Sequence, residues 1–282
     1  MILDGKETAK VLKEEVKQEL DAFYAAGNPK CNLAIVVVGD DPASAVYVRN
    51  KGKSCEAVGI GNKLVTLPAT STQEEVEAEI KKLASDKTTH GILVQLPLPK
   101  GLDGEKATSL VPSEKDVDGF TVSSLGKLVV GEKGFTSCTP GGIVYMLKRY
   151  GVTLKGKHAV IIGRSKIVGK PLALLLLNED CTVTVCHSKT ENLAEITKTA
   201  DILIAAVGRP EFVTGNMVKD GAVVVDVGIN RTENGLKGDV LFEEVEKKAS
   251  LITPVPGGVG PMTVAYLMKN TLEAYKSQLS LK

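Results

Sequence analysis

The stretch AVIIGRSKIVGKPLALLL, residues 159–176, decides the fold of the second half of the chain. It begins with apolar residues typical of a strand buried on both faces, turns at Gly163, and continues as an apolar helix. This order usually opens a dinucleotide-binding unit, because free N–H groups at the start of the helix suit a pyrophosphate. The common fingerprint is G-x-G-x-x-G, but here Ser165 replaces the second glycine and Gly169 comes one residue late. The loop alone is therefore equally compatible with an ordinary tight turn in an α/β protein.

Strand patterns alternate with helix patterns along the rest of the chain. Apolar runs without alternation indicate strands buried on both faces, and the segments between them have the spacing of helices. One helix has a start signal, since Thr72 and Glu75 form the pattern of a capping box. This repeated order predicts parallel sheets. The expected strands lie at residues 32–40, 62–68, 90–99, 156–165, 181–188, 200–208 and 221–228.

The segment 97–140 breaks this alternation. It is rich in proline and glycine and contains the polar sequence PSEKDVDGF. A chain of 282 residues usually makes one large or two ordinary domains, and the break favours two. We place the domain junction near the end of this segment.

The composition favours a small-molecule ligand. Thirty-five Lys plus Arg against 34 Asp plus Glu leave a formal net charge of +1, so we expect neither nucleic acid nor an anionic membrane as a partner. No apolar stretch approaches the length of about 18 residues that suggests a membrane helix, and no leader pattern begins the chain. The five cysteines lack C-x-x-C spacing, so we expect reduced thiols and no metal site.

The end of the strand that follows the glycine loop indicates which dinucleotide is bound. NAD enzymes usually carry an acidic residue there, roughly 20 residues on, for the ribose 2′-hydroxyl. This chain has His187, Ser188 and Lys189 instead, and Arg164 lies in the loop itself. A cation and a hydroxyl hold a 2′-phosphate, which a carboxylate would repel. The pattern predicts NADP, with a solvated strand end as the alternative for Ser188 and Lys189.

The first half offers a further pair of residues, since Tyr47 and Lys51 fall one turn apart on one helix face. Alone, this pair indicates only a surface lysine beside a half-buried tyrosine. With seven further motifs in order, however, the sequence resembles the bifunctional methylenetetrahydrofolate dehydrogenase/methenyltetrahydrofolate cyclohydrolase family along essentially its whole length. The motifs are Y-V-R-N-K at 47–51, V-Q-L-P-L-P at 94–99, D-V-D-G at 116–119, C-T-P at 138–140, G-R-S-K-I-V-G-K-P at 163–171, C-H-S-K-T at 186–190, D-V-G-I-N at 226–230 and P-V-P-G-G-V-G-P-M-T at 254–263.

The resemblance implies two α/β domains that flank a cleft. Residues 1–139, completed by a C-terminal helix at 264–282, correspond to a folate-binding and catalytic domain with a parallel sheet, and residues 140–263 to a Rossmann-like NADP-binding domain. It also implies two reactions, in which NADP oxidises 5,10-methylenetetrahydrofolate to 5,10-methenyltetrahydrofolate and water then converts this product to 10-formyltetrahydrofolate. A cytoplasmic homodimer, formed through the nucleotide-binding domain, is implied as well.

The resemblance also assigns roles to residues. Lys51 is the catalytic lysine and Gln95 its hydrogen-bonding neighbour, while Tyr47 stacks on the aminobenzoyl part of the folate. Asp118 grips the pterin, since one carboxylate can accept hydrogen bonds from its amino group and ring N–H together. Glycine near a flat substrate lets the backbone approach it closely. The other expected substrate-binding residues are Val94, Leu96, Pro256, Gly257, Gly258 and Gly260, and the expected cofactor-binding residues are Gly163, Arg164, Ser165, Ser188, Gly208 and Ile229.

Two positions depart from the pattern that we associate with the family. Ser137 stands where we expect proline before the cysteine, and Gly142 stands where we expect a larger residue. We expect these two departures to affect the mobility of the domains rather than the catalytic activity. The alternatives left open are a dehydrogenase with a weak or absent cyclohydrolase step, a two-domain NADP dehydrogenase of the shikimate type, and a catalytically silent folate- or nucleotide-binding module.

Overall fold

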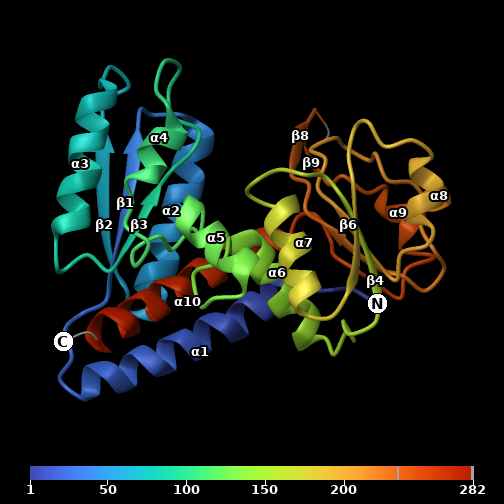
Figure 1. The fold of residues 1–282 in the computed structure, drawn as a ribbon, viewed down its shortest axis with the longest axis horizontal. Helices are drawn as coiled ribbons and strands as arrows, with labels where there is room; N and C mark the ends of the chain where they lie inside the picture. Colours follow the sequence, from blue (N-terminus) through green and yellow to red (C-terminus); the bar gives the residue numbers. More distant parts are fainter. Residues whose placement is uncertain (234, 281–282) are drawn as a thin grey trace. The chain divides into compact units, whose positions relative to one another are not determined.

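The computed structural model describes residues 1–233 and 235–280, and the chain divides into two compact units (Figure 1). The three-stranded unit comprises Val11–Cys138 and the chain from Val264 onward, and the five-stranded unit comprises Met1–Lys10 and Thr139–Thr263. Each unit has a central sheet whose strands are all parallel. The predicted class, two α/β domains with parallel sheets, is confirmed.

The sheet of the three-stranded unit has the order β2-β1-β3. Its connections are helical, as the alternation of patterns predicts, and the predicted capping box is present at Thr72, whose side chain accepts a hydrogen bond from the N–H of Glu75. The Glu75 side chain accepts in return from the N–H of Thr72. The elements are β1 Asn32–Val38, α2 Pro42–Val58, β2 Gly61–Leu67, α3 Gln73–Ser85, β3 Gly91–Val94, α4 Gly104–Ser109 and α5 Val122–Val130.

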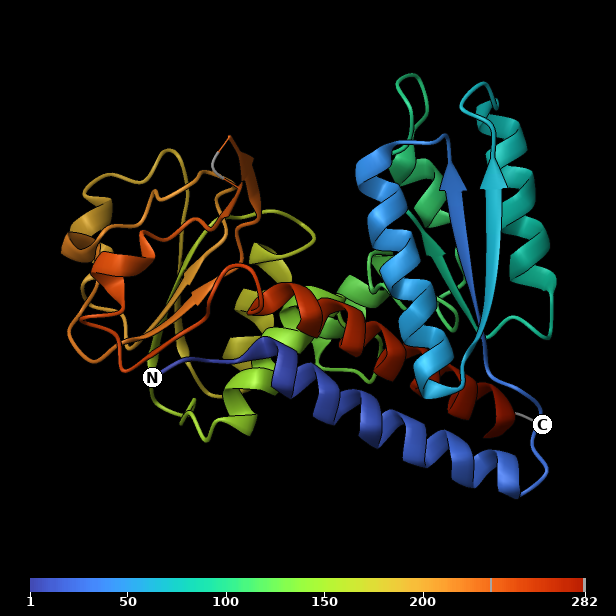
Figure 2. The ribbon, with the colours of Figure 1, turned by 180° about the vertical axis from the view of Figure 1, so that it is seen from behind.

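Alternate residues of β1 belong to two cores. Leu33 and Ile35 pack with residues of α2 and with buried residues of α1 (Gly5–Ala25) and α10 (Val259–Ser280). Ala34 and Val36 pack on the other side with residues of α3. Helices α1 and α10 lie side by side along this unit (Figures 1 and 2). The strands are therefore covered on both faces, which explains their unbroken apolar sequences.

The sheet of the five-stranded unit has the order β10-β7-β6-β4-β5. Its central strand β6 is fully buried, and a small antiparallel pair, β8 with β9, follows the carboxyl end of β7. The elements are α6 Cys138–Arg149, β4 His158–Ile162, α7 Gly169–Asn178, β5 Thr182–Cys186, α8 Leu193–Thr197, β6 Ile202–Ala205, a 3₁₀ turn at Gly215–Met217, β7 Val223–Asp226, β8 Asn230–Thr232, β9 Gly235–Lys237, α9 Phe242–Val245 and β10 Leu251–Ile252.

The start of the chain adds to the edge of this sheet. Ile2 forms a parallel bridge with Ile252, and the N–H of Leu3 donates to the Ile252 carbonyl at 2.8 Å. Sequence patterns did not predict this pairing, because three residues are too few to show a period. Among the residues described, no helix combines the length and apolar character needed to cross a bilayer.

Candidate active site and cofactor site

Lys51 and Gln95 form a direct hydrogen bond in the three-stranded unit. Lys51 lies on α2 and its Nζ donates to Gln95 Oε1 at 3.0 Å. Gln95 directly follows β3, and its orientation is fixed because its backbone N–H donates to the Val36 carbonyl (2.9 Å) and its Nε2 to the Leu96 carbonyl (2.8 Å). The amide oxygen is therefore the atom left to accept from Lys51. Tyr47, one turn before Lys51, is 43% exposed.

The two aspartates of D-V-D-G differ in their surroundings. Asp116 is buried, and its carboxylate accepts hydrogen bonds from the N–H groups of Gly119 (3.1 Å) and Thr121 (2.9 Å) and from Ser124 Oγ (2.6 Å). Asp116 therefore holds the loop. Asp118 is half-buried. Burial raises the pKa of Asp118, whereas the nearby Lys51 ammonium lowers it. The structure thus brings Lys51, Gln95 and Asp118 into one neighbourhood.

Two expected substrate residues beside Gln95 pack against a hydrophobic core. Val94 is only 3% exposed and Leu96 packs against the same core, which contains residues of α3 and β1. The Val94 side chain is therefore taken up by the core, whereas the Leu96 side chain is partly exposed, and a role toward substrate stays a prediction for both. The Leu96–Pro97 peptide bond is cis.

The segment around Pro256 belongs to the five-stranded unit, and its glycines allow close packing within the chain. Gly257 has φ +113°, and a Cβ on Gly258 would lie 2.6 Å from the Pro254 carbonyl oxygen. Gly260 differs, since a Cβ there would meet its nearest neighbour, Ile229 Cδ1, at an ordinary 3.5 Å. The glycines at 257 and 258 are therefore explained by the fold itself, and a role toward substrate stays a prediction for this segment.

The glycine loop after β4 explains why its second glycine comes late. Gly163 has φ +128°, and a Cβ there would lie 2.2 Å from the Ala206 carbonyl oxygen at the end of β6. A Cβ on Gly169 would lie 2.1 Å from the Gly163 carbonyl oxygen. Glycine is therefore needed where the loop meets β6 and where α7 begins against the loop. Ser165 Oγ accepts from the N–H groups of Val168 (3.2 Å) and Gly169 (3.4 Å), so it caps the first turn of α7 and keeps its hydroxyl hydrogen to donate.

A pocket of about 470 Å³ opens beside this loop, at the carboxyl ends of β4, β5 and β6. Parallel sheets commonly bind ligands at this edge. Three of the six expected cofactor residues line the pocket: Gly163, Arg164 and Ser188. Gly208 lies between two lining residues in the sequence, whereas Ile229 is 45% exposed and does not line the pocket. The other lining residues are Ile162, His187, Thr190, Leu193, Ala206, Val207, Arg209 and Phe212.

The sequence patterns missed Arg209, which lines this pocket. Its guanidinium lies 4.6 Å from the centroid of the Phe212 ring, an arrangement that orients a cation. The sequence did carry a signal for Arg209, since it directly follows Gly208 at the end of an apolar run. Arg164 and Ser188 lie at corresponding ends of other predicted strands.

Asp239, which no motif singled out, holds the loop that carries Arg209. Asp239 is fully buried, and its carboxylate accepts from the N–H groups of Val207 (2.6 Å), Gly208 (2.9 Å) and Arg209 (2.9 Å). Asp226, at the end of β7, in turn accepts from the N–H of Asp239 at 2.9 Å. The two carboxylates therefore shape one wall of the pocket through the backbone.

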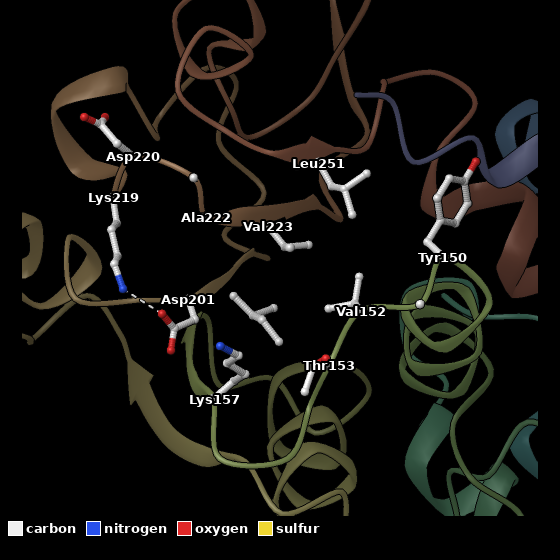
Figure 3. Close-up of a pocket in the computed structure, with 13 residues that line it drawn as sticks. Tyr150, Val152, Thr153, Lys157, Asp201, Lys219, Asp220, Ala222, Val223 and Leu251 are labelled. Atoms are coloured by element: carbon white, nitrogen blue, oxygen red, sulfur yellow. Dashed lines mark hydrogen bonds and ion pairs between the residues drawn. The ribbon is translucent and has the colours of Figure 1, made fainter.

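A second pocket of about 350 Å³ lies at the amino ends of β4, β6, β7 and β10 (Figure 3). Lys219 Nζ and Asp201 Oδ1 form an ion pair there at 2.6 Å, and Asp201 also accepts from the N–H of His158. These contacts lower the pKa of Asp201. Its charged groups therefore stabilise the sheet end, and none of the expected site residues lies here.

Comparison with known proteins identifies the family. Residues 3–118 match the family model of the tetrahydrofolate dehydrogenase/cyclohydrolase catalytic domain. Residues 137–279 match the model of the tetrahydrofolate dehydrogenase/cyclohydrolase NAD(P)-binding domain. The bifunctional protein FolD of Maridesulfovibrio salexigens is 54% identical over 99% of both chains.

Two solved structures extend this similarity to the fold. The bifunctional FolD enzyme of Campylobacter jejuni has a TM-score of 0.96 and 48% identity over 98% of this chain and 99% of that one. The Trypanosoma brucei N5,N10-methylenetetrahydrofolate dehydrogenase-cyclohydrolase, solved with NADP and an inhibitor, has a TM-score of 0.93 and 38% identity over 99% of this chain and 98% of that one. The chain belongs to the tetrahydrofolate dehydrogenase/cyclohydrolase family.

Proposed function

We propose that this chain oxidises 5,10-methylenetetrahydrofolate with NADP and hydrolyses the resulting 5,10-methenyltetrahydrofolate to 10-formyltetrahydrofolate. Family membership over both domains supports this pair of reactions and excludes the shikimate-type alternative. The single observation that carries it is the hydrogen bond between Lys51 and Gln95 next to the Asp118 carboxylate. These are the groups needed to anchor a pterin and to handle a proton beside it.

In the proposed substrate site, Asp118 accepts two hydrogen bonds from the pterin and Tyr47 offers an exposed ring for the aminobenzoyl group. Lys51 interacts with both parts of this site, because its ammonium is attracted to the Asp118 carboxylate and its Nζ donates a hydrogen bond to Gln95. We assign Pro256, Gly257, Gly258 and Gly260 to the same substrate as backbone contributors.

The cofactor pocket fits a dinucleotide phosphate. The glycine loop packs directly against the end of β6 and the start of α7, and the N–H end of α7 favours an anion. Arg164 and Ser188 supply a cation and a hydroxyl for the 2′-phosphate, and we add Arg209 as a second cation on the pocket wall. When NADP is bound, its nicotinamide supplies the acceptor for a hydride from the methylene carbon.

Hydrolysis asks more of the protein than hydride transfer does. Water adds to the methenyl carbon and releases one proton to solvent. The carbon–N5 bond then breaks as the remaining hydroxyl becomes the formyl C=O and its proton is passed to N5. We assign Lys51 Nζ to hold and return this proton, with Gln95 Oε1 fixing its position. Oxidation gives up no proton to the protein in its chemical step, so it depends mainly on positioning.

One absorbance trace tests the proposal against its alternatives. Methenyltetrahydrofolate absorbs light, so its rise after addition of NADP reports oxidation and its later decay reports hydrolysis. We expect both phases with the wild-type chain. A rise without enzyme-dependent decay indicates a dehydrogenase alone, and no rise indicates a silent binding module.

We further propose that the chain acts as a cytoplasmic homodimer formed through the five-stranded unit, as the family resemblance implies. Light scattering of the purified chain tests the dimer, since a mass near 29.8 kDa would show a monomer instead.

A further inference from the structure

The two backbone carbonyls on either side of Asp118 are both hydrogen-bonded to side chains. The Val117 carbonyl accepts from Asn270 Nδ2 at 2.8 Å and from Cys138 Sγ at 3.3 Å. The Gly119 carbonyl accepts from Ser137 Oγ at 3.2 Å. The backbone before and after Asp118 is thus fixed by groups that lie far from it in the sequence.

All three donors are buried. Ser137 is 1% exposed, Cys138 is 2% exposed and Asn270 is 5% exposed. Asn270, on α10, also donates to the Thr136 carbonyl at 2.9 Å, so one amide joins the aspartate loop to the segment that precedes α6. Water does not compete well for buried bonds of this kind, so they hold the loop firmly.

The loop also lies directly against this segment. A Cβ on Gly119 would lie 2.6 Å from the backbone nitrogen of Ser137, so only glycine permits the contact. The carboxylate of Asp116 organises the loop from inside through the N–H groups of Gly119 and Thr121. From outside the loop, Ser137, Cys138 and Asn270 donate hydrogen bonds to its carbonyl groups. Together these bonds fix the backbone of the loop, while the Asp118 carboxylate interacts with the Cys138 thiol and with the Lys51 ammonium.

We propose that Ser137, Cys138 and Asn270 form a positioning clamp, which sets the backbone on both sides of Asp118 and thereby aims its carboxylate at the pterin. The proposal rests on the proposed role of Asp118 in binding folate. Ser137 is the member that distinguishes this chain, because it stands where the family resemblance predicts proline, which has no side-chain donor. A serine hydroxyl here adds a bond to the Gly119 carbonyl.

The first test removes two members of the clamp separately. Ser137→Ala and Asn270→Ala are compared with Thr271→Ala, a control that loses a buried hydroxyl on α10 whose bond, to the Leu267 carbonyl at 2.8 Å, stays within the helix. We expect Ser137→Ala to raise KM for the folate about two- to tenfold in both reactions, from the loss of one hydrogen bond, with kcat little changed. Asn270→Ala should raise it further, and the control should lower thermal stability without raising KM. Unchanged KM values in both clamp variants would overturn the proposal.

The second test asks whether the clamp acts through Asp118. Ser137→Ala is repeated in the Asp118→Asn background, where we expect no further rise in KM, because the group that the clamp aims is already lost. An equal rise in both backgrounds would show that Ser137 acts elsewhere. If Asp118→Asn alone leaves folate binding unchanged, the proposed role of Asp118 fails. If Asp118→Asn raises KM for the folate but neither Ser137→Ala nor Asn270→Ala does, the clamp is rejected and the proposed role of Asp118 stands.

Discussion

Replacing Gly169 with alanine tests whether the late glycine of the loop is there to let α7 begin against it. The new Cβ would lie 2.1 Å from the Gly163 carbonyl oxygen and 3.0 Å from Arg164 Cα. Ordinary contact begins near 3.4 Å, so the first turn of α7 and the loop must separate by about 1.3 Å. Overpacking of this kind typically costs about 1–3 kcal/mol of folding free energy.

The same movement displaces the N–H groups that we propose to bind the cofactor. A misplacement of about 1 Å can cost on the order of 100-fold in catalysis, so we expect NADP binding to weaken at least tenfold. Isothermal titration with NADP and thermal unfolding measure the two effects. The matched control is Gly126→Ala on α5, where a Cβ would meet nothing within 4 Å, and which should gain up to about 1 kcal/mol from better helix propensity. A Gly169→Ala variant that binds NADP and unfolds as the wild type does would refute this reading of the loop.

Three further predictions concern single charged residues. Arg164→Ala should raise KM for NADP about ten- to a hundredfold, because a charge-assisted contact is lost, and should raise KM for NAD much less. An equal rise in both KM values would reject Arg164 as a 2′-phosphate ligand. Asp118→Ala should damage both reactions together, because both use one bound folate, so loss of hydrolysis alone would contradict its anchoring role. Asp86 accepts from the hydroxyls of Thr88 (2.7 Å) and Thr89 (2.9 Å), and bonds of this kind hold the pKa of Asp86 well below its ordinary value of 3.8. Its contribution to stability is therefore fully present above about pH 4 and declines as the pH falls from there toward the depressed pKa of the folded state. Denaturant unfolding should show Asp86→Asn less stable than wild type at pH 7, with a gap that narrows toward pH 3; a gap independent of pH would disprove this.

Local sequence patterns predicted much of the fold. The strand at 159–162, the helix after Gly169 and the capping box at Thr72 all follow from rules about neighbouring residues. The pairing of Ile2 with Ile252 does not, because it joins the two ends of a unit. Strand periodicity has no means of showing such a contact.

The candidate site shows the same division. Motifs singled out Lys51, Gln95 and Asp118, and the structure brings them together. Asp239 and Asn270 act through backbone groups 30 or more residues away, so no local spacing marks them. Ser165 shows a subtler limit. Its place in the glycine loop predicts phosphate binding, which stays a prediction, and no pattern indicated that its oxygen also caps the first turn of α7.

The most direct test of the central claim is the hydrolysis of methenyltetrahydrofolate by Lys51→Met. This change removes the ammonium that donates to Gln95 and keeps the length and apolar stem of the side chain, and circular dichroism checks the fold. General acid–base help is typically worth about 10²–10⁴-fold, so we predict that cyclohydrolase activity falls by at least 100-fold while the dehydrogenase falls less. Hydrolysis at the wild-type rate would contradict the account and leave Lys51 an ordinary surface lysine.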